Sequence, residues 1–537
     1  MKNNDIRIKN ISDKKDQLYE VDLDNLPELP YPYHDWEDPP IEEIQESKRE
    51  KYDSSLDGFL NLQVKKPKTD EEKEKYVAGF LTGLKRLLTK EENWTFLKPF
   101  MLSLDNCVKC NTCSEACPIF ESSGRAEVYR PLFRSDTLRR IIRKYLKPGG
   151  KLTAKFTGAD IDLNWETVAR LAQLSYRCTL CRRCAQTCPM GVDNGLITRE
   201  IRKLFSMELG ISPQELHGDG TLKQLATGSS TGITPPALMD LMEFAEEDLK
   251  DRTGLDIKIP FDKPSADILL IHNAGEFLSW PENLEAFAIL FEIAGLNWTL
   301  SSEMVGYDSV NYCLFYDDAQ YARVTIKHAE VAKKLGVKKV VVGECGHAHK
   351  AIMAIGDRIW MGESNIPRES GMVTMEDLIV NEKVMFDPER NDFPVTLHDP
   401  CNMARSMGII KPQREILKKI CPQFREMTPH GVHNYCCGGG SGFAIMQSNN
   451  FPAWKYMISG RKKFGQILNA FTKEELDPSV NKYICAPCSN CKGQIRDLLN
   501  YYDAYERCRF LYGGLVELII NAMVDVREGF IEWDDFH

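Results

Sequence analysis

The sequence predicts a multidomain protein in which a mostly helical module is followed by an α/β region built from two similar halves, with an extended arm at the N-terminus. Three observations predict this architecture. Two cysteine motifs of identical spacing lie among helical patterns, short β-rich runs alternate with helical runs after residue 262, and residues 1–67 are rich in charge and proline. At 537 residues and 43% hydrophobic content, the chain is long enough for three or four domains with real cores.

Composition excludes some classes of function. The formal net charge of -10 argues against a nucleic acid as the main partner, because phosphate contacts favour a basic face. The charged N-terminal residues lack the apolar stretch of a signal peptide, so the cysteines are expected in a reducing, cytoplasmic compartment. The longest apolar run, residues 515–524, contains Glu517 and is too short to span a bilayer. Any membrane association is therefore expected to be peripheral, through a partner subunit.

Residues 1–67 are predicted to form an extended arm, because their Asp, Glu, Lys and Pro content cannot pack a core alone. Two interpretations are open: the arm wraps a neighbouring subunit, or it is a disordered tail. Tyr31, Tyr33 and Trp36 favour docking, since a free tail has little use for aromatic anchors.

Residues 68–217 are predicted to form a helical domain. Thr69 and Glu72 have the spacing of a capping box in front of an apolar stripe, which indicates the start of a helix. Further helices are predicted for two stretches between the cysteine motifs, SDTLRRIIRKYL and NWETVARLAQLSY.

This helical domain carries the spacing CxxCxxCxxxCP twice. That spacing is typical of cubane [4Fe-4S] ligands, and the fourth cysteine normally serves the other cluster. The predicted ligands of the two cubanes are Cys107, Cys110, Cys113 and Cys188 for the first, and Cys178, Cys181, Cys184 and Cys117 for the second. Zinc sites or disulfides are the alternatives, but zinc usually takes two separated CxxC pairs and not a run that ends in CP. The motifs therefore predict electron transfer.

The remaining domains are predicted from changes in pattern. A polar stretch with glycine and threonine indicates a linker over residues 218–262. The alternation of strands and helices that follows predicts parallel sheets, with ligand sites beyond the carboxyl ends of the strands. We expect a first half over residues 263–385, a second half over 386–500, and a helical tail over 501–537.

The two halves are similar in sequence. LLIHNAG aligns with VTLHDPC, and KKVVVGECGHA aligns with NKYICAPCSNC. In this register His272 corresponds to His398 and Cys345 corresponds to Cys488. Cys485 falls on Val342, an apolar strand position, and is therefore predicted not to be a ligand.

The second half keeps five cysteines, whereas the first half has lost most of its own. We name them the five-cysteine site: Cys401, Cys436, Cys437, Cys488 and Cys491. Adjacent cysteines such as Cys436 and Cys437 cannot both grip one face of a cubane comfortably, but they can bind separate irons of an opened cluster. The glycines that follow them permit close backbone approach.

The pattern CxnCCGxmCxxC resembles the cysteine-rich CCG domain of heterodisulfide reductase, in which such a motif holds a noncubane [4Fe-4S] cluster by five cysteines. A helical ferredoxin module followed by two CCG repeats is similar to the D subunit of heterodisulfide reductase. The length, the acidic arm and the degenerate first repeat resemble the K subunit of the sulfite-reduction-associated membrane complex of sulfate reducers and sulfur oxidisers. The resemblance covers roughly residues 95–500 and implies a single noncubane cluster, held by the five-cysteine site.

The resemblance implies a catalytic iron-sulfur subunit of a membrane-associated respiratory complex in sulfur metabolism. Electrons from menaquinol would enter through a membrane cytochrome b subunit, cross the two cubanes, and reduce (or form) a disulfide or trisulfide on a small sulfur-carrier protein with C-terminal cysteines. Two alternatives are open: an electron-relay subunit that connects a flavoprotein dehydrogenase to quinone, and an inert structural scaffold. No flavin or nucleotide site is expected, because GxGxxG and GxxxxGK[ST] loops are absent.

His398 is the first candidate for proton handling, because it precedes the ligand Cys401 and disulfide cleavage consumes two protons. Four other histidines lie near cysteines and have either this role or a structural one: His347, His349, His430 and His433. Cys345 is either a buried structural cysteine or a residue that reaches the catalytic cluster from the first half. The cysteines without spacing partners are expected to be ordinary buried residues: Cys313, Cys421 and Cys508.

Overall fold

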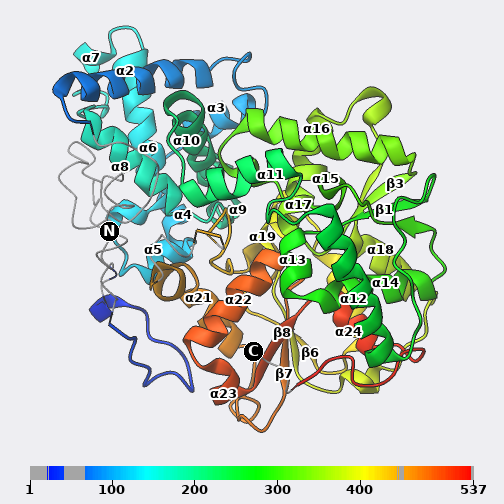
Figure 1. Cartoon of the computed structure of the whole chain (residues 1–537). Coiled ribbons are helices and arrows are strands. Elements are labelled where there is room, and N and C mark those ends of the chain that lie inside the picture. The colour runs from blue at the N-terminus through cyan, green and yellow to red at the C-terminus, as the bar shows by residue number, and fades with distance from the viewer. Residues whose placement is uncertain (1–20, 22, 41–66, 444, 447–452, 534–537) are drawn as a thin grey trace.

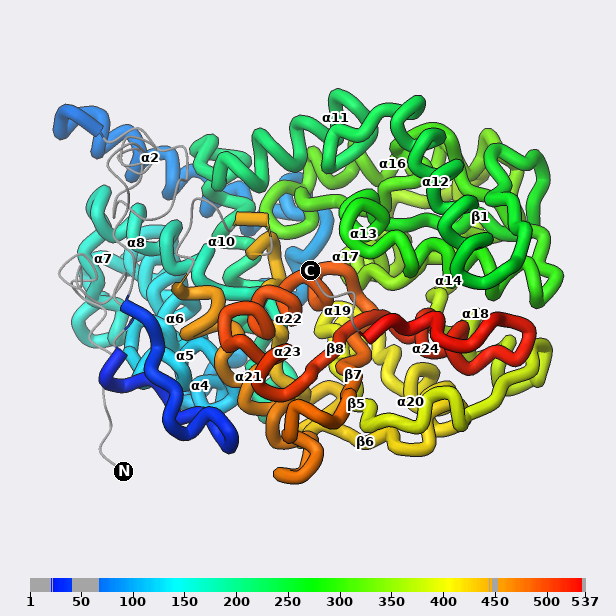
Figure 2. Tube along the Cα trace, turned by 60° about the horizontal axis from the view of Figure 1, so that its bottom comes forward, coloured from blue at the N-terminus to red at the C-terminus, as the bar shows by residue number. Residues whose placement is uncertain are grey.

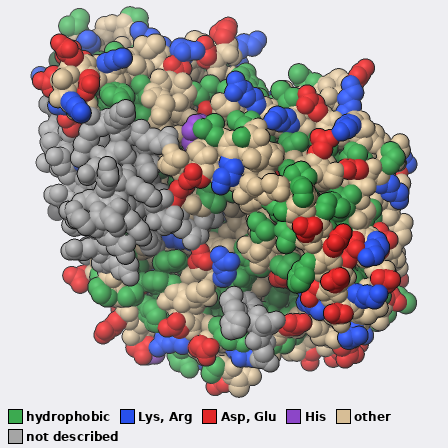
Figure 3. Space-filling view, viewed as in Figure 1, with side chains coloured by type: hydrophobic (Ala, Val, Ile, Leu, Met, Phe, Trp, Pro, Cys, Tyr) green, Lys and Arg blue, Asp and Glu red, His purple; other side chains and the backbone are tan. Residues whose placement is uncertain are grey.

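A computed structural model of the chain describes residues 21, 23–40, 67–443, 445–446 and 453–533 (Figure 1). Helices from the N-terminal part of the chain gather at one end of the molecule, and the two sheets lie at the other end. On the face shown in Figure 3, acidic and basic side chains are interspersed.

The helical module begins where the capping signal predicts. Thr69 Oγ1 accepts the backbone N–H of Glu72 at 3.2 Å, and α2 follows. Phe80 and Leu84 of α2 are fully buried against Phe205 and its neighbours in one shared core. The helices of the module are α2 (Asp70–Leu87), α3 (Leu97–Asp105), α4 (Thr112–Glu115), α5 (Pro118–Ser122), α6 (Pro131–Ile141), α7 (Gly150–Thr153), α8 (Trp165–Tyr176), α9 (Arg183–Gln186) and α10 (Asn194–Leu209).

The α/β region contains two four-stranded parallel sheets with the same strand order. The first sheet has the order β2-β1-β3-β4 and the second has the order β6-β5-β7-β8. The strands are β1 (Ile268–Ile271), β2 (Trp298–Thr299), β3 (Lys339–Val342), β4 (Arg368–Ser370), β5 (Val395–Leu397), β6 (Phe424–Glu426), β7 (Lys482–Cys485) and β8 (Phe510–Gly513).

Strand register agrees with the sequence alignment of the halves. Ile271 pairs with Val342 in the first sheet, and Leu397 pairs with Cys485 in the second. Val342 and Cys485 therefore occupy equivalent strand positions, and His272 and His398 each follow directly after the equivalent strands β1 and β5.

Helices cover both sheets. They are α13 (Ala274–Ser279), α14 (Pro281–Ile293), α15 (Met304–Tyr307), α16 (Asp318–Leu335), α17 (Gly346–Ala348), the π-helix η8 (His349–Ile355), α18 (Gly371–Val380), α19 (Cys401–Met407), α20 (Lys411–Ile420), α21 (Arg461–Leu468), α22 (Ser489–Tyr501), α23 (Ala504–Cys508) and α24 (Leu515–Ala522). α24 packs against α14 of the first half and α20 of the second half, so an apolar core joins the two (Figure 2).

Two predicted boundaries are corrected by the structure. Residues 218–262, predicted to be a linker, contain α11 (Lys223–Thr227) and the 19-residue helix α12 (Pro235–Thr253). α12 forms because Leu238, Met242 and Leu249 share one helical face, which packs against α14.

The tail predicted over residues 501–537 is not simply helical. Its FLYG run is the buried strand β8, which completes the second sheet, and α24 is buried on all sides. The helical prediction is therefore wrong for this run. The reason is that a fully buried segment lacks the alternation of apolar and polar residues that distinguishes a strand from a helix.

The described part of the predicted arm, residues 21 and 23–40, lies on this chain's own surface. The Tyr33 hydroxyl donates to the Tyr502 carbonyl at 2.8 Å, Trp36 packs against the same tyrosine ring, and Asp38 pairs with Arg461 at 2.7 Å. Tyr31 is 45% exposed. The remainder of the predicted arm lies outside the described residues, and its contact with a neighbouring subunit stays a prediction.

Within the described ranges, none of the helices combines the length and the apolar character that crossing a bilayer requires.

Candidate iron-sulfur sites

The two ferredoxin-type motifs have the same backbone shape. In the first, Lys109 and Asn111 have left-handed conformations with φ of 56° and 65°, and in the second the equivalent Leu180 and Arg182 have φ of 49° and 63°. Left-handed non-glycine residues are uncommon, so their occurrence at matching positions shows that both loops curl in the same way. A short helix follows each loop, α4 after the first and α9 after the second.

Cysteines from both motifs gather in the first of two groups. One pocket is lined by Cys107, Cys110, Cys113 and Cys188, together with residues of the first loop and residues that follow Cys188. The Val192 N–H donates to the Cys188 Sγ at 3.3 Å, and Cys110 is exposed. Burial and then the neighbouring Cys107 raise the pKa of Cys113 to about 11. Four thiols around one space, with an amide donor to sulfur, fit a cluster ligated in the crossed manner.

Cys117 of the first motif has the thiols of the second motif as neighbours, in addition to Cys113 of its own motif. Desolvation, together with negative charge on Cys181 and Cys178, raises the pKa of Cys117 to about 12. Cys184 also has Cys117 among its neighbours, and the Leu180 N–H donates to the Cys178 Sγ at 3.4 Å. The grouping is the one that the sequence predicted for the second cubane.

The five-cysteine site lies at the carboxyl edge of the second sheet. Cys401 is the first residue of α19 after β5, and Cys488 and Cys491 lie at the start of α22 after β7. Because β5 and β7 are neighbouring parallel strands, these segments meet at the same edge of the sheet. All five thiols are buried, with exposed fractions of 9% or less.

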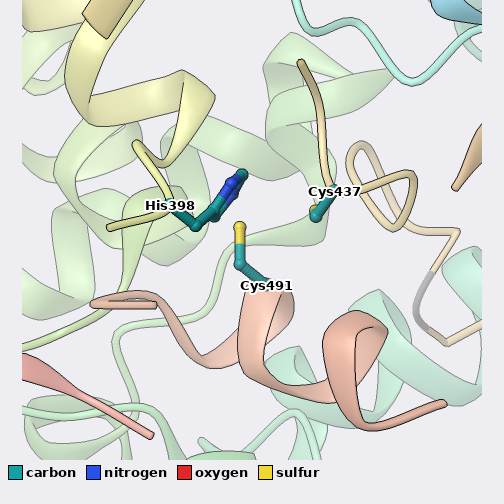
Figure 4. Close-up of side chains that lie close together, drawn as sticks. All are labelled: His398, Cys437 and Cys491. Atoms are coloured by element: carbon teal, nitrogen blue, oxygen red, sulfur yellow. The ribbon is translucent and has the colours of Figure 1, made fainter. Parts of the chain in front are cut away.

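Two of the five cysteines approach a histidine closely. The Sγ atoms of Cys437 and Cys491 and a ring nitrogen of His398 all lie within 4.8 Å of one another (Figure 4). Hydrogen bonding to Cys436 and to Cys491 lowers the pKa of Cys437. Cys436 in turn interacts with Cys401, so the cysteines form one connected set.

Backbone amides from both halves reach the sulfur atoms. The Gly438 N–H donates to the Cys436 Sγ at 3.4 Å, and the Gly346 N–H donates to the Cys488 Sγ at 3.3 Å. Gly346 belongs to the first half, and a Cβ atom there would lie 3.2 Å from the Cys488 Sγ. Amide donors to thiolates stabilise negative charge at a cluster.

His398 is buried to 1% exposure, and neither ring nitrogen has a hydrogen-bond partner of acceptable geometry among the described residues. Buried polar atoms are normally satisfied, so this ring suits a group bound between the thiols. Burial lowers the pKa of His398. The next residue, Asp399, fixes the loop, because its carboxylate accepts two bonds from Arg414 at 2.8 and 2.9 Å and one from the Gly431 N–H at 2.6 Å.

The other predicted histidines differ in position. His347 is buried and accepts a hydrogen bond from the Asn490 side chain at 2.5 Å. Burial lowers the pKa of His347 to about 3, against the raising effect of negative charge on Cys437. His349 bonds the Cys345 carbonyl at 2.8 Å and the Ser370 hydroxyl at 2.7 Å, which is a structural role. His430 and His433 have exposed side chains and are not brought into the site.

Cys345 and Cys485 differ in their position relative to the five-cysteine site. Cys345 is fully buried beside Cys488, and burial raises its pKa to about 12. Cys485 lies within β7, where burial and then the carboxylate of Glu344 raise its pKa, and no cysteine of the five-cysteine site is among the causes of that shift. The remaining isolated cysteines are buried too: Cys313, Cys421 and Cys508.

Arginines connect the helical module to the five-cysteine site. Arg405 of α19 donates to the Cys181 carbonyl at 2.9 Å and to the Val432 carbonyl at 2.7 Å. Arg202 of α10 donates to the Cys178 carbonyl at 2.6 Å and to the Ser441 carbonyl at 3.3 Å. The second ferredoxin motif and the glycine-rich loop after Cys437 are thereby held together.

This loop approaches the second motif so closely that side chains are excluded. A Cβ atom on Gly440 would lie 2.8 Å from the Thr179 carbonyl oxygen, and one on Gly438 would lie 2.7 Å from the backbone of Gly460. Gly438 also has φ of 100°, which favours glycine.

Sequence reasoning missed two polar residues at the site. Lys463 of α21 is fully buried and donates to the Asn434 side chain at 2.7 Å. Burial lowers the pKa of Lys463 to about 7, against the raising effect of the Cys437 charge. Its segment, RKKFGQIL, carries no signal that one lysine points inward. Arg405 could have been found, because it lies one helical turn after Cys401 and therefore on the same face of α19.

Family models match two segments of the chain. A 4Fe-4S dicluster domain matches residues 103–192, which include all eight cysteines of the two motifs, and a cysteine-rich domain matches residues 395–496, which include the five-cysteine site.

Several curated proteins are similar over most of the chain. The Hdr-like menaquinol oxidoreductase iron-sulfur subunit 2 of Archaeoglobus fulgidus is 28% identical over 491 residues, which cover 83% of each chain. The D subunit of the dihydromethanophenazine:CoB–CoM heterodisulfide reductase of Methanosarcina acetivorans is 26% identical over 357 residues, 64% of this chain and 79% of the relative. The EtfAB:quinone oxidoreductase of Syntrophomonas wolfei is 22% identical over 79% of this chain and 58% of its own.

Proposed function

This chain belongs to the family of iron-sulfur proteins that resemble the D subunit of heterodisulfide reductase, and from that membership we propose that it reduces a sulfur–sulfur bond at the five-cysteine site. The chain is an iron-sulfur electron-transfer subunit of an oxidoreductase that works with partner subunits. One observation above all supports the reduction of a sulfur–sulfur bond: five buried cysteines and His398 converge beside the second ferredoxin motif.

We propose three clusters. Two cubane [4Fe-4S] clusters are held by the crossed sets Cys107, Cys110, Cys113 and Cys188, and Cys178, Cys181, Cys184 and Cys117. One noncubane [4Fe-4S] cluster is held by Cys401, Cys436, Cys437, Cys488 and Cys491. When bound, such clusters take up and release single electrons and offer iron to a sulfur ligand. Two thiol groups that draw cysteines from both motifs suit cubanes better than zinc, which takes separated pairs.

Exposure identifies the end of the proposed series of clusters at which a partner can dock. Cys110 is exposed and its neighbour Val108 is 60% exposed, so the first thiol group is the end that accepts electrons from a partner. The second group adjoins the five-cysteine site, because the thiols of Cys181 and Cys436 interact and Arg405 of α19 donates to the Cys181 carbonyl at 2.9 Å. We propose a membrane cytochrome b subunit as that partner and menaquinol as the electron source, in a peripheral, cytoplasmic position on the membrane.

The reaction is balanced by two electrons and two protons. A disulfide RSSR′ takes up two electrons and two protons and becomes RSH and R′SH, and the oxidation of one menaquinol to menaquinone releases the same number of each. His398 is placed to hold a proton at a ring nitrogen and pass it to the departing thiolate. We propose a disulfide or trisulfide on a small sulfur-carrier protein with C-terminal cysteines as the substrate, in sulfur metabolism such as sulfate reduction. A trisulfide takes up four electrons and four protons, from two menaquinols, and releases H₂S in addition to the two thiols.

We also propose that the two halves are a duplicated CCG domain. Their identical strand order and their equivalent registers support a common origin. The first half has lost its cluster ligands, and its surviving Cys345 lies beside Cys488.

Spectroscopy of the oxidised full chain with its clusters tests the proposal. A paramagnetic signal that changes when a thiol, or a peptide with two C-terminal cysteines, is added supports sulfur chemistry at the five-cysteine site. A signal that no thiol alters would overturn it.

A second candidate is electron relay to quinone, favoured by the similarity to the EtfAB:quinone oxidoreductase. In that case a flavoprotein would reduce the clusters, and thiols would leave both the spectrum and the rate of quinone reduction unchanged.

A further inference from the structure

A cavity of about 360 Å³ lies between the helical module and the first half. One part of its wall is apolar: Phe96, Leu102, Leu180, Leu196, Leu314 and Ile355. The other part is charged, with four cations and a single acid: Arg182, Arg199, Lys350, Arg358 and Asp193. A cavity with both kinds of wall suits a ligand that has an apolar chain and a negative group.

Carboxylates neutralise two of the four cations. Arg182 pairs with Asp193 at 2.6 Å, and Arg199 pairs with Glu200 at 2.8 Å and with Asp318. Because each of these two arginines already has a carboxylate partner, neither needs an anionic ligand to balance its charge.

Lys350 and Arg358 have no carboxylate partner among the described residues. Arg358 donates to the Trp94 carbonyl at 3.1 Å and lies over the Phe96 ring. For Lys350, no hydrogen bond or ion pair is found within the described ranges, although its side chain is half-buried. A half-buried cation without a partner is costly, and an anion in the cavity would remove that cost.

The cavity adjoins the proposed reaction site. Leu180 and Arg182 belong to the second ferredoxin motif, and Arg182 also donates to the Arg405 carbonyl of α19 at 3.4 Å. Lys350 lies in η8, which packs against α19, and α19 begins with Cys401. The charge of Cys401 acts on the ammonium group of Lys350. A ligand in this cavity therefore lies beside Leu180 and Arg182 of the second ferredoxin motif, and the helix that carries Lys350 packs against the helix that begins with Cys401.

We propose that this cavity binds a carboxylate carried by the sulfur substrate, with Lys350 as its cationic contact and Arg358 at the rim. The inference rests on the proposed function and deepens it, since it defines the substrate as a disulfide with a carboxylate on a short apolar chain. The carboxylate has two possible sources: a small disulfide acid, or the free C-terminus of a protein tail.

Isothermal titration calorimetry of the full chain with its clusters tests the small-molecule source. The two probes are dithiodiglycolate, which is a disulfide with two carboxylates, and its diamide, which is the same disulfide without charge. The unsubstituted protein is expected to bind the acid about tenfold more tightly than the diamide. Lys350→Met should abolish that preference and Lys350→Arg should retain it. Lys250→Met, which removes an exposed lysine of α12 outside the cavity, should leave it unchanged.

A second pair of probes tests the protein source: a disulfide-linked peptide that ends in cysteine, with its C-terminus either free or amidated. Preference for the free carboxylate in only one pair of probes identifies the source. Equal affinities within both pairs, or a preference that survives Lys350→Met, would overturn the inference. If Lys350→Met does not fold, Arg358→Met should weaken the same preference, and no change there would count equally against it.

Turnover is measured separately. If the acid is preferred but neither disulfide is reduced, the proposed function fails and the binding site stands. If acid and diamide bind and are reduced alike, the function stands and the binding site fails.

Discussion

The thiols of Cys181 in the second ferredoxin motif and of Cys436 in the five-cysteine site interact across the junction between the helical module and the α/β region, and each affects the pKa of the other. These two thiols belong to different proposed clusters. Because electron transfer slows steeply with distance, direct contact between ligands of the two clusters makes this junction the natural path for electrons. Arg405 and the close approach of Gly440 hold the junction in place.

Cys437→Ser should remove the noncubane cluster and leave both cubanes. The Cys437 thiol lies between Cys436 and Cys491, so its loss breaks the connected set of sulfurs. Iron analysis should show about one third less iron, since one of three four-iron clusters is lost. Dithionite should still reduce both cubanes, as followed by electron paramagnetic resonance. If the cubane signals disappeared as well, the separation into independent sites would be incorrect.

Arg405→Met should weaken the junction. The substitution leaves the buried carbonyl of Asn434 and the part-buried carbonyls of Cys181 and Val432 without this donor, at a cost of about 2–4 kcal/mol. We expect a lower melting temperature and slower electron transfer from the cubanes to the five-cysteine site, measured by freeze-quench paramagnetic resonance.

Arg323→Met is the matched control, because Arg323 is exposed on α16 and donates to the Gln320 side chain of the same helix at 3.1 Å. It should alter neither property. An Arg405→Met protein with the transfer rate of the unsubstituted chain would contradict the role assigned to the junction.

Gly440→Ala should separate the two loops. The new methyl group would lie 2.8 Å from the backbone oxygen of Thr179, which cannot move as a flexible side chain would. We expect slower reduction of the noncubane cluster with its iron content retained. Gly465→Ala in α21, where the nearest atom is Pro30 Cδ at 3.4 Å, should have no such effect and controls for the loss of a glycine.

Val108→Asp should slow reduction by the membrane partner but not by dithionite. Val108 is 60% exposed beside the first thiol group, and Met190 of the same pocket is 45% exposed. A carboxylate at this apolar rim would be desolvated when a partner docks. The measurement compares cluster reduction by menaquinol in the assembled complex with reduction by dithionite. Equal slowing by both reductants would indicate damage to the cluster itself.

Carboxylate preference in the cavity should depend on pH. Burial, together with the positive charges of Arg182 and Arg199, lowers the pKa of Lys350 to about 8, against the raising effects of Asp193 and Cys401. Below this pH the ammonium group is charged and attracts the carboxylate. The preference for the acid over the diamide should therefore be complete about one pH unit below the pKa of Lys350 and lost about one pH unit above it.

Titrations across this range with dithiodiglycolate and its diamide measure the effect. In Lys350→Arg the guanidinium stays charged, and the preference should persist at high pH. A preference independent of pH in the unsubstituted chain would contradict the assignment to Lys350.

The sequence predicted the helical module, the parallel sheets and the register of the halves, because each depends on local spacing. Thr69 marked the start of α2, and the equivalence of Val342 and Cys485 was visible in the aligned strands. The structure also brings the cysteines together in the predicted groups, since strand order places Cys401 and Cys488 at one sheet edge.

Other features were beyond the sequence because they depend on contacts between distant segments. Lys463 and Lys350 resemble surface lysines in their local segments, and only tertiary packing encloses them. The strand β8 falls in a segment predicted to be a helical tail, because a run buried on every side lacks the alternation that identifies a strand.

The bond from the Gly346 N–H to the Cys488 Sγ has a consequence for engineering. The half without ligands supplies part of the wall and one amide donor for the sulfurs of the other half. The second half therefore cannot be excised as a minimal module without exposing its sulfurs to water, and a shortened version would need a substitute for the discarded partner. The first half therefore supports a site whose proposed ligands all come from the second half.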